Sequence, residues 1–503
     1  MAGILVLAAG CADGYDSPSG FDLGVYNTQM ETPVQDSITF KVSTDGETAT
    51  VSWPLVAGAD GHEVTFVNVD DPDNPVVIDG YDKKIVDGSS FTVSVAEDSK
   101  YQMTMRTLGN KSLGNKDDQE SHTYNFSTLV PSVMTIPDGV CINEYIAQHG
   151  LDVVNSEVAI DLVANGQYTL TDTVDFGGHD LTFRGDKVHR PVVTVKERGS
   201  FATWSGLKFK FINFDMTEAQ CNSFLYMSKR APDSILVQNL PNYVGSKIQS
   251  NTYMVEPPIY IAHCWFKNLP QCMLHDNKMT CAFWYFTVSD CIVQMKNDKG
   301  GNIGFICMYE GSGPGGRSVK NITIENSTIY NIVDNNQACF IRYSNESNSA
   351  PNKCYGEYNA DYNSHTWVFK NSTFSRCYTG WRFVNNVSGN NRTVTIDHCI
   401  FYNVAQLYRI NEKKGTRSYR FNFYWNDTES YRRDLRETDS SNAPFASEYD
   451  PMFGGDNAAN VSSELDFSQP NGGVNFAPTE YQIVSNRGGD PRWLDSSDAD
   501  TQQ

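Results

Sequence analysis

Five segments between residues 259 and 401 repeat one eight-residue pattern, and this repeat constrains the fold more than any other feature of the chain. Each segment alternates apolar with other residues, and then continues with His, Asp or Asn, Cys or Ser, any residue, and an apolar residue. The segments are Ile259–Phe266, Phe286–Val293, Ile322–Ile329, Trp367–Phe374 and Val394–Phe401. Their spacings of 27, 36, 45 and 27 residues are typical of stacked repeats. Each repeat has too few strands for a propeller blade, so the pattern favours a parallel β-helix.

Stacking of the coils would align equivalent residues in rows along the solenoid. One expected row consists of small residues at a tight corner, namely Cys264, Cys291, Ser327, Ser372 and Cys399. A second row consists of short polar side chains that can satisfy backbone groups of a turn, namely His263, Asp290, Asn326, Asn371 and His398. We interpret both rows as structural. The neighbouring Asp397 and His398 are therefore expected to have a structural role rather than to form a catalytic pair. Looser coils are expected over Ala159–Phe183 and Leu207–Phe214.

Residues 35–129 are predicted to form a separate small β-sandwich. Ser37–Ser43 and Ala49–Trp53 alternate cleanly around the turn Asp45-Gly46, and further strands are expected up to Thr128. A Trp on the second strand and Tyr101 at the start of a late strand resemble the fibronectin type III pattern, in which such a tyrosine forms a corner contact. Sandwich modules carry many functions, and we expect this one to be a spacer.

The N-terminus is interpreted as a targeting signal rather than as part of the fold. Residues 1–10 are small or apolar and end at Cys11, as in a bacterial lipoprotein signal that is cleaved before a lipidated cysteine, although a basic n-region is missing. Residues 11–34 would form a polar tether that holds the protein at a membrane without spanning it. Of the twelve cysteines, eleven remain without Cys11, and most lie in apolar strands, so we expect buried thiols rather than disulfides.

The remaining boundaries follow from breaks in these patterns. Residues 130–150 are expected to be a linker with a capping helix, since Ile142, Tyr145, Ile146 and His149 share one helical face before Gly150. The β-helix is assigned to residues 151–495, with a tail over 496–503. The formal net charge of −21 argues against a nucleic-acid partner. The expected fold is therefore all-β, with a sandwich followed by a parallel β-helix.

A lipid-anchored Cys11, a fibronectin-like module and a pectate-lyase-like right-handed β-helix together resemble the surface lipoproteins of Bacteroidetes polysaccharide-utilisation systems. The ending Gly488–Leu494 is similar to the closing motif of many such chains. The resemblance implies an outer-membrane, cell-surface location and a glycan transporter complex as partner. It implies little about activity, because that family mixes glycan-binding proteins with polysaccharide lyases.

Three arginines are the first candidates for contact with a glycan. Arg342, Arg382 and Arg409 each lie between apolar residues after a repeat segment, so the alternation predicts that they point outward and stack on one face. Stacked like charges need an anionic partner, and guanidinium groups suit carboxylates because two hydrogen bonds form at once. We therefore expect an acidic, uronate-containing, pectin-like polysaccharide as the ligand.

Two neighbouring groups add to this candidate site. Residues 409–436 contain eight basic and four acidic residues, with Arg417 and Arg420 among the basic ones. The alternative is a solvated loop whose charges pair with acidic neighbours. Tyr355, Tyr358 and Tyr362 lie in a polar insertion, where exposed rings can stack against sugars or tuck down onto the solenoid wall.

Binding without catalysis is the favoured function, and two alternatives stay open. A pectate-type lyase acting by β-elimination would use Arg382 and Arg409 to neutralise the carboxylate and Asp397 as a base. No cofactor is expected for binding, although the lyase alternative leaves Ca²⁺ open, because some lyases use it. The second alternative is an adhesion or structural surface protein that does not cleave glycans.

Overall fold

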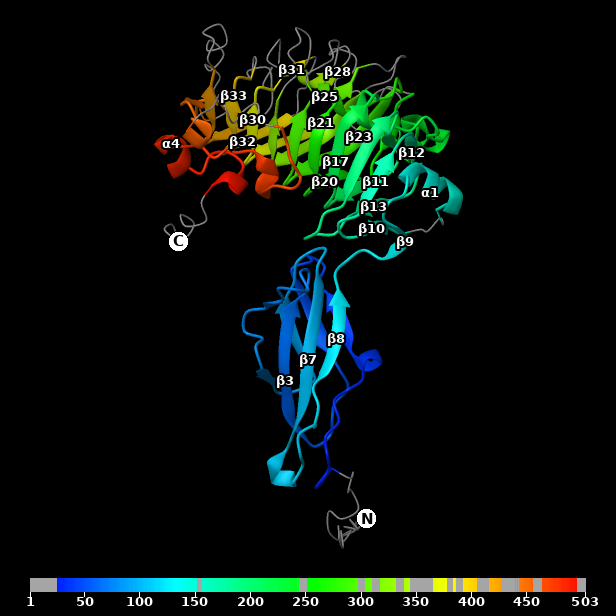
Figure 1. The fold of residues 1–503 in the computed structure, drawn as a ribbon, viewed down its shortest axis with the longest axis vertical. Helices are drawn as coiled ribbons and strands as arrows, with labels where there is room; N and C mark the ends of the chain where they lie inside the picture. Colours follow the sequence, from blue (N-terminus) through cyan, green and yellow to red (C-terminus); the bar gives the residue numbers. More distant parts are fainter. Residues whose placement is uncertain are drawn as a thin grey trace, which may run out of the picture. The chain divides into compact units, whose positions relative to one another are not determined.

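A computed structural model describes residues 25–151, 156–241, 243, 251–296, 304–309, 317–331, 339–343, 365–377, 383–385, 392–404, 416–426, 439, 441, 443–455 and 464–494. The contacts within the chain divide it into two compact units, Met1–Val130 and Pro131–Gln503. Figure 1 shows that both units are built almost entirely of strands. No helix among the described residues is long and apolar enough to cross a membrane.

The N-terminal unit is a sandwich of two antiparallel sheets. One sheet has the order β1-β2-β6, and in the other β3 pairs with β4, β5 and β7, which in turn pairs with β8. The bounds are β1 Thr39–Val42, β2 Thr48–Ser52, β3 Ala59–Asn68, β4 Val76–Val77, β5 Lys84–Val86, β6 Ser90–Ser94, β7 Lys100–Gly109 and β8 His122–Ser127. Alternate residues of the longer strands are buried, including Trp53, Phe66 and Phe91. The hydroxyl of Tyr101 accepts a hydrogen bond from the Ala96 amide at 2.6 Å, which is the corner contact expected from the sequence.

The sandwich begins earlier than the sequence pattern indicates. The Met30 amide donates to the Lys116 carbonyl at 3.0 Å, and the Lys116 amide donates to the Thr28 carbonyl at 3.0 Å. Met30 is buried, and the Thr32 amide donates to the Asp118 carboxylate at 2.7 Å. The described end of the predicted tether is therefore part of the sandwich. The sequence does not indicate this, because the segment pairs through a single bridge rather than a ladder and so shows no strand alternation.

The second unit is a right-handed parallel β-helix in which successive strands build three parallel sheets. The first sheet contains β9 Ser132–Ile136, β10 Val158–Leu162, β13 Leu181–Arg184, β16 Leu207–Lys210, β19 Tyr253–Val255, β20 Ile259–Ala262, β23 Cys281–Ser289, β26 Ser318–Glu325, β29 His365–Lys370, β32 Arg392–Asp397 and β34 Thr416–Arg420. The second contains β11 Gln167–Leu170, β14 Val192–Glu197, β17 Asn213–Ala219, β21 Trp265–Leu269, β24 Ile292–Met295, β27 Thr328–Tyr330, β30 Thr373–Ser375, β33 Ile400–Tyr402, β35 Phe423–Trp425 and β36 Ser447–Glu448. The third contains β12 Thr173–Asp175, β15 Ser200–Thr203, β18 Ser223–Met227, β22 Cys272–His275, β25 Gly304–Met308, β28 Cys339–Tyr343 and β31 Val384–Asn385.

The register of the five repeat segments is the one that the sequence pattern predicts. The first residues of successive segments are direct partners in the first sheet, from Ile259 to Phe286, Ile322, Trp367 and Val394. Because the side chains alternate, these apolar residues all point inward and are buried together. The predicted stacking of coils is thereby confirmed.

Both predicted rows lie at the corner between the first and second sheets. The polar row has φ between 47° and 55°, a left-handed conformation that His, Asp and Asn tolerate better than most residues. The side-chain amide of Asn371 also donates to the Asn326 side-chain oxygen at 3.2 Å. In the small row, the Cys291 amide donates to the Ser327 hydroxyl at 3.1 Å, so the row satisfies buried backbone groups. None of the ten described cysteines forms a disulfide, as expected.

The N-terminal end of the β-helix is covered by α1, Ile142–His149, as predicted. Ile142 is buried, and Tyr145 and Ile146 pack against the core, whereas His149 is exposed and stacks on Tyr145. The predicted boundary at residue 151 is wrong, because β9 pairs in parallel with β10 and the second unit begins at Pro131. The short helical segments elsewhere are α4 Tyr481–Ser485 and the 3₁₀ turns η2 Gln35–Ser37, η3 Lys111–Leu113, η4 Asp233–Ile235, η5 Val237–Asn239, η9 Phe453–Gly455, η10 Pro470–Gly473 and η11 Pro491–Trp493.

The closing motif of the chain is anchored on the second sheet. Asp490 is buried, and its carboxylate accepts hydrogen bonds from the Thr328 hydroxyl at 2.8 Å and from the Arg492 guanidinium at 2.9 Å. The indole of Trp493 donates to the same Thr328 hydroxyl at 2.6 Å. Gly489 has φ of 94°, and a Cβ there would lie 2.8 Å from the Ile400 side chain, which explains the glycine. The motif therefore ties the chain end to the coils.

Asp490 predicts a pH dependence of stability. Burial raises the pKa of its carboxyl to about 6, although Arg492 opposes the shift. The folded state therefore favours the neutral acid, and this contribution is full below the unfolded pKa near 4 and is lost as pH rises through about 6, at a cost of up to about 3 kcal/mol. Asp490→Asn should gain stability relative to the natural chain between pH 4.5 and 7, measured by denaturant unfolding. A constant difference between the two proteins would contradict this assignment.

Candidate functional site

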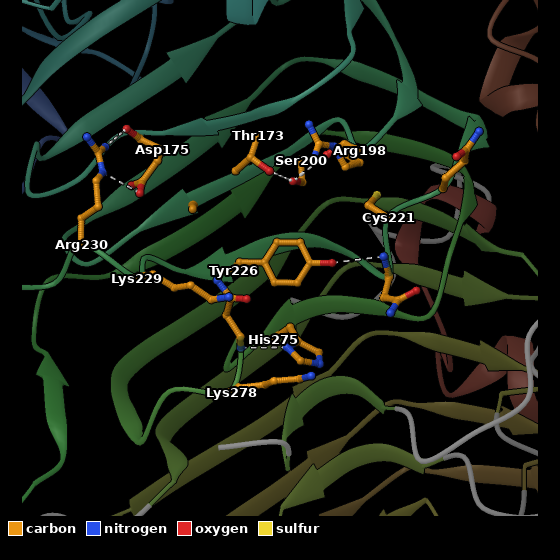
Figure 2. Close-up of a pocket in the computed structure, with 14 residues that line it drawn as sticks. Thr173, Asp175, Arg198, Ser200, Cys221, Tyr226, Lys229, Arg230, His275 and Lys278 are labelled. Atoms are coloured by element: carbon orange, nitrogen blue, oxygen red, sulfur yellow. Dashed lines mark hydrogen bonds and ion pairs between the residues drawn. The ribbon is translucent and has the colours of Figure 1, made fainter. Parts of the chain in front are cut away.

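A pocket of about 820 Å³ lies on the outer face of the third sheet, over its N-terminal coils. Register places Ala202, Tyr226 and His275 side by side on β15, β18 and β22, and all three line the pocket. Inward residues at neighbouring positions, such as Phe201 and Leu225, belong to the core. Figure 2 shows the lining, which comprises Thr173, Asp175, Arg198, Ser200, Ala202, Gln220, Cys221, Asn222, Tyr226, Lys229, Arg230, His275, Asn277 and Lys278.

The pocket lining is strongly basic, in contrast to the acidic chain as a whole. Four of the lining side chains are cationic and one is a carboxylate. Arg198 pairs with Asp172 at 2.9 Å, and Arg230 pairs with Asp175 at 2.8 Å. Lys229 and Lys278 are exposed, and among the described residues neither has a carboxylate within ion-pair distance. These two lysines are the charges that remain available to an anionic ligand.

The two lysines hold equivalent places on adjacent coils. Each follows by three residues one member of the register pair Tyr226 and His275. Asn277 adopts a left-handed backbone conformation, and its side-chain amide donates to the Met227 carbonyl at 2.9 Å. This bond joins the turn after β22 to the last residue of β18. Since adjacent coils lie about 4.8 Å apart, the two ammonium groups can serve neighbouring anionic groups of one ligand.

The one lining carboxylate is already engaged. Asp175 accepts hydrogen bonds from the Arg230 guanidinium at 2.8 Å, the Ser228 hydroxyl at 2.7 Å and the Gly177 amide at 2.9 Å. Figure 2 shows Arg230 hydrogen-bonded to this carboxylate at one end of the pocket. Glycoside hydrolysis ordinarily uses two carboxyl groups that flank the scissile bond. The described lining does not supply such a pair.

The floor of the pocket is formed by half-buried and buried rings. Tyr226 and His275 meet edge to face with ring centroids 5.5 Å apart. The Tyr226 hydroxyl accepts the Asn222 amide at 3.1 Å, and burial, more than the nearby thiols, raises the pKa of Tyr226 well above its ordinary value. Hydroxyl and amide groups of Ser200, Gln220 and Asn222 surround this floor. The combination of a ring face, polar groups and free cations suits a sugar that bears carboxylates.

The structure places Arg342 differently from the sequence prediction. Arg342 is 4% exposed, and its guanidinium lies 4.4 Å from the ring centre of Tyr309. All five residues of β28 are buried, so the alternation that predicts an exposed face does not hold there. Its register partner on β31 is Asn385, three residues beyond Arg382. The prediction of an exposed Arg342 is therefore wrong, and Asn385 takes the register position beside it.

Arg417, Arg420 and Asp397 lie on a different sheet from Arg342 and from the pocket. They belong to β34 and β32 of the first sheet. Asp397 is buried and accepts two hydrogen bonds from Arg420, at 2.9 and 2.6 Å, and contacts His398 Nδ1 at 2.7 Å. Burial opposes its ionisation, but Arg420 and His398 outweigh this and lower the pKa of Asp397. A carboxylate held in this way is a weak candidate for a base.

The other predicted site residues lie outside the described part of the chain. These are Cys11, Arg382, Arg409, Tyr355, Tyr358 and Tyr362. None of the pocket residues was predicted from the sequence. The signal that could have found them is the equal offset of Lys229 and Lys278 from the ends of β18 and β22, but those coils lack the repeated motif that sets the register.

One group of described residues could hold a metal ion. Cys272, His275 and Cys307 are buried, and their ligand atoms lie within 4.8 Å of one another. No carboxylate cluster of the kind that Ca²⁺ prefers was found in the described part of the chain. The Ca²⁺ alternative therefore gains no support from the described residues.

Comparisons with known proteins give no activity for this chain. Residues 1–167 match a family described as a domain of unknown function, DUF4992, and residues 166–332 match a second one, DUF4957. No curated protein matches. A family 28 exopolygalacturonase of Yersinia enterocolitica is similar at 11% identity and a TM-score of 0.28, over 80% of this chain and 88% of its own. The pectate lyase PelI of Erwinia chrysanthemi, solved with tetragalacturonic acid, is similar at 7% identity and a TM-score of 0.13, over 54% and 88% respectively. Neither similarity is close enough to support an argument, so the fold rests on the strand pairing.

Proposed function

We propose that this chain is a surface lipoprotein, anchored in the outer membrane through Cys11, whose β-helix binds an acidic, uronate-containing polysaccharide. The pocket over β12, β15, β18 and β22 is the proposed binding site. The observation that carries the proposal is a pair of exposed lysines on adjacent coils, Lys229 and Lys278, neither of which pairs with a carboxylate of the described residues. A uronate chain presents one carboxylate per acidic sugar, which such a pair can match.

The N-terminal parts have supporting roles in this proposal. The fibronectin-like sandwich serves as a spacer, and lipid at Cys11 holds the β-helix at the cell surface. Tethering raises the effective concentration of a binding site near a transporter without any chemistry. A glycan transporter complex is accordingly the proposed partner.

Binding is favoured over lysis because the expected base is not available. Asp397, the candidate base, is bonded to Arg420 and His398 and lies on the first sheet rather than at the pocket. Arg382 and Arg409 remain candidates for ligand contact as predicted from the sequence.

Retention on immobilised polygalacturonate tests the proposal. We expect the full chain to be retained at low salt and released as salt increases, and not to be retained on a neutral glycan of equal size. The same incubation, followed by ultraviolet absorbance, detects the unsaturated product of a lyase, and we expect no increase. Retention that is equal on both glycans, or absent from both, would contradict acidic-glycan binding.

A further inference from the structure

Three side chains with soft ligand atoms meet beside the pocket, on the third sheet. Cys272 and His275 lie on β22 with two residues between them, and Cys307 on β25 is the register partner of His275. The ligand atoms of all three residues lie within 4.8 Å of one another, and all three residues are buried. Thiolate and imidazole ligands together favour Zn²⁺ and similar transition metals over Ca²⁺ or Mg²⁺.

The spacing of the ligand atoms is close to that of a tetrahedral zinc site. Zn–S bonds of about 2.3 Å and Zn–N bonds of about 2.0–2.1 Å place tetrahedral ligand atoms roughly 3.5–3.8 Å apart. The upper limit of 4.8 Å is therefore within about 1 Å of the required separation. Rotation of the two cysteine side chains can supply this movement without a change in the strands.

The backbone around the three residues is held by hydrogen bonds on both sides. The Cys272 amide donates to the Asn222 carbonyl at 3.0 Å, and the Asp276 amide donates to the Cys307 carbonyl at 3.0 Å. Leu274 and Ile306, which lie next to the ligands, are direct partners in the core. Ligands on two paired strands of a solenoid are pre-organised, so little order has to be gained when a metal binds.

A fourth residue is placed to orient the histidine. Asp276 is fully buried, and its Oδ1 lies 3.6 Å from His275 Nδ1. In this structure Nδ1 accepts the Asn277 amide at 2.8 Å, so the ring proton is on Nε2. A metal on Nε2 requires the ring proton on Nδ1, so the bond from the Asn277 backbone amide would be replaced by a hydrogen bond from Nδ1 to the Asp276 carboxylate. Metal-binding histidines ordinarily have such a carboxylate or carbonyl partner.

We propose that Cys272, His275 and Cys307 bind one Zn²⁺ ion, with Asp276 as the positioning residue for His275. Both thiols release their protons to solvent on binding, and two thiolates balance the charge of the ion. Three protein ligands leave one tetrahedral position for water or another ligand. Since His275 also lines the pocket, the ion would lie at the pocket floor. This inference does not depend on the proposed glycan.

Zinc titration of the full chain tests the site. The protein is kept reduced, stripped with a chelator and titrated with Zn²⁺ against a chromophoric competitor. We expect one equivalent per chain, and with Co²⁺ a thiolate charge-transfer band in the near ultraviolet. Cys272→Ser and Cys307→Ser should each lose both signals. Cys264→Ser is the matched control, because Cys264 is equally buried and its row contains serine in other coils.

Two further measurements keep the test independent of folding defects. Asp276→Asn should keep the cobalt band but lower the Zn²⁺ affinity roughly 10-fold to 100-fold. X-ray absorption of the zinc-loaded natural chain should give a first shell with two sulfur atoms and at least one nitrogen. Less than one equivalent of Zn²⁺, a shell without sulfur, or unchanged binding in Cys272→Ser and Cys307→Ser would overturn the proposal.

Discussion

Replacement of Lys229 and Lys278 together by alanine should weaken the binding of polygalacturonate by up to roughly 25-fold at low salt. Exposed charge pairs contribute at most about 1 kcal/mol each, which is roughly fivefold in affinity for each lysine. The expected loss is the product of the two effects, because in the proposed complex the lysines would contact different carboxylates. Removal of two cationic contacts should also flatten the dependence of affinity on salt. Affinity electrophoresis at several salt concentrations measures both effects.

Lys370→Ala is the matched control for this experiment. Lys370 is an exposed lysine at the end of β29, on the first sheet, so its loss changes the net charge without touching the pocket. The control should bind as the natural chain does. If it loses as much affinity as the double variant, the effect is one of net charge and not of the pocket. If Arg382→Ala and Arg409→Ala lose affinity and the double lysine variant does not, the site lies where the sequence analysis placed it.

Phe340→Ala should destabilise the β-helix by about 3–5 kcal/mol, the range for a large aromatic residue removed from a packed core. Phe340 is fully buried on β28. Its ring stacks between those of Phe305 and Phe383, with centroid distances of 4.7 Å on both sides. This spacing is close to the distance between neighbouring coils, so the three rings form a continuous column. A truncated middle ring leaves a cavity that the neighbouring coils cannot close.

Denaturant unfolding of the full chain measures this effect, with Tyr285→Ala as the control. Tyr285 lies on β23 and is 45% exposed, so its loss should change stability by less than about 1 kcal/mol. The transition assigned to the β-helix should move in Phe340→Ala only. Equal shifts in both variants would contradict the assignment of Phe340 to the column.

The fold was predictable where the chain repeats a local pattern. The register of Ile259 with Phe286 and the later segments follows from one repeated corner, at which a residue such as Asn326 takes a left-handed conformation. A small residue such as Ser327 follows it in the interior. The left-handed corner residue and the small residue after it are both local requirements, so they appear as a repeated pattern in the sequence. The same logic predicted the sandwich strands, whose alternation reflects one buried face.

The candidate site was not predictable in the same way. Arg342 was expected to be exposed, because a strand with one solvated face alternates, but β28 is buried along its whole length. Alternation cannot show what covers the outer face of a coil. Lys229 and Lys278 lie in turns after strands without the repeat motif, so their proximity depends on a register that only the structure supplies. The cluster of Cys272, His275 and Cys307 was unpredictable for the same reason, because it combines residues of two strands whose register only the structure supplies.

A co-crystal structure with an oligogalacturonate is the most direct measurement of where the ligand binds. Our account predicts uronate carboxylates within hydrogen-bonding distance of the Lys229 and Lys278 ammonium groups, with a sugar ring over Tyr226. An oligosaccharide bound on another sheet, or in the pocket without contact to either lysine, would contradict it.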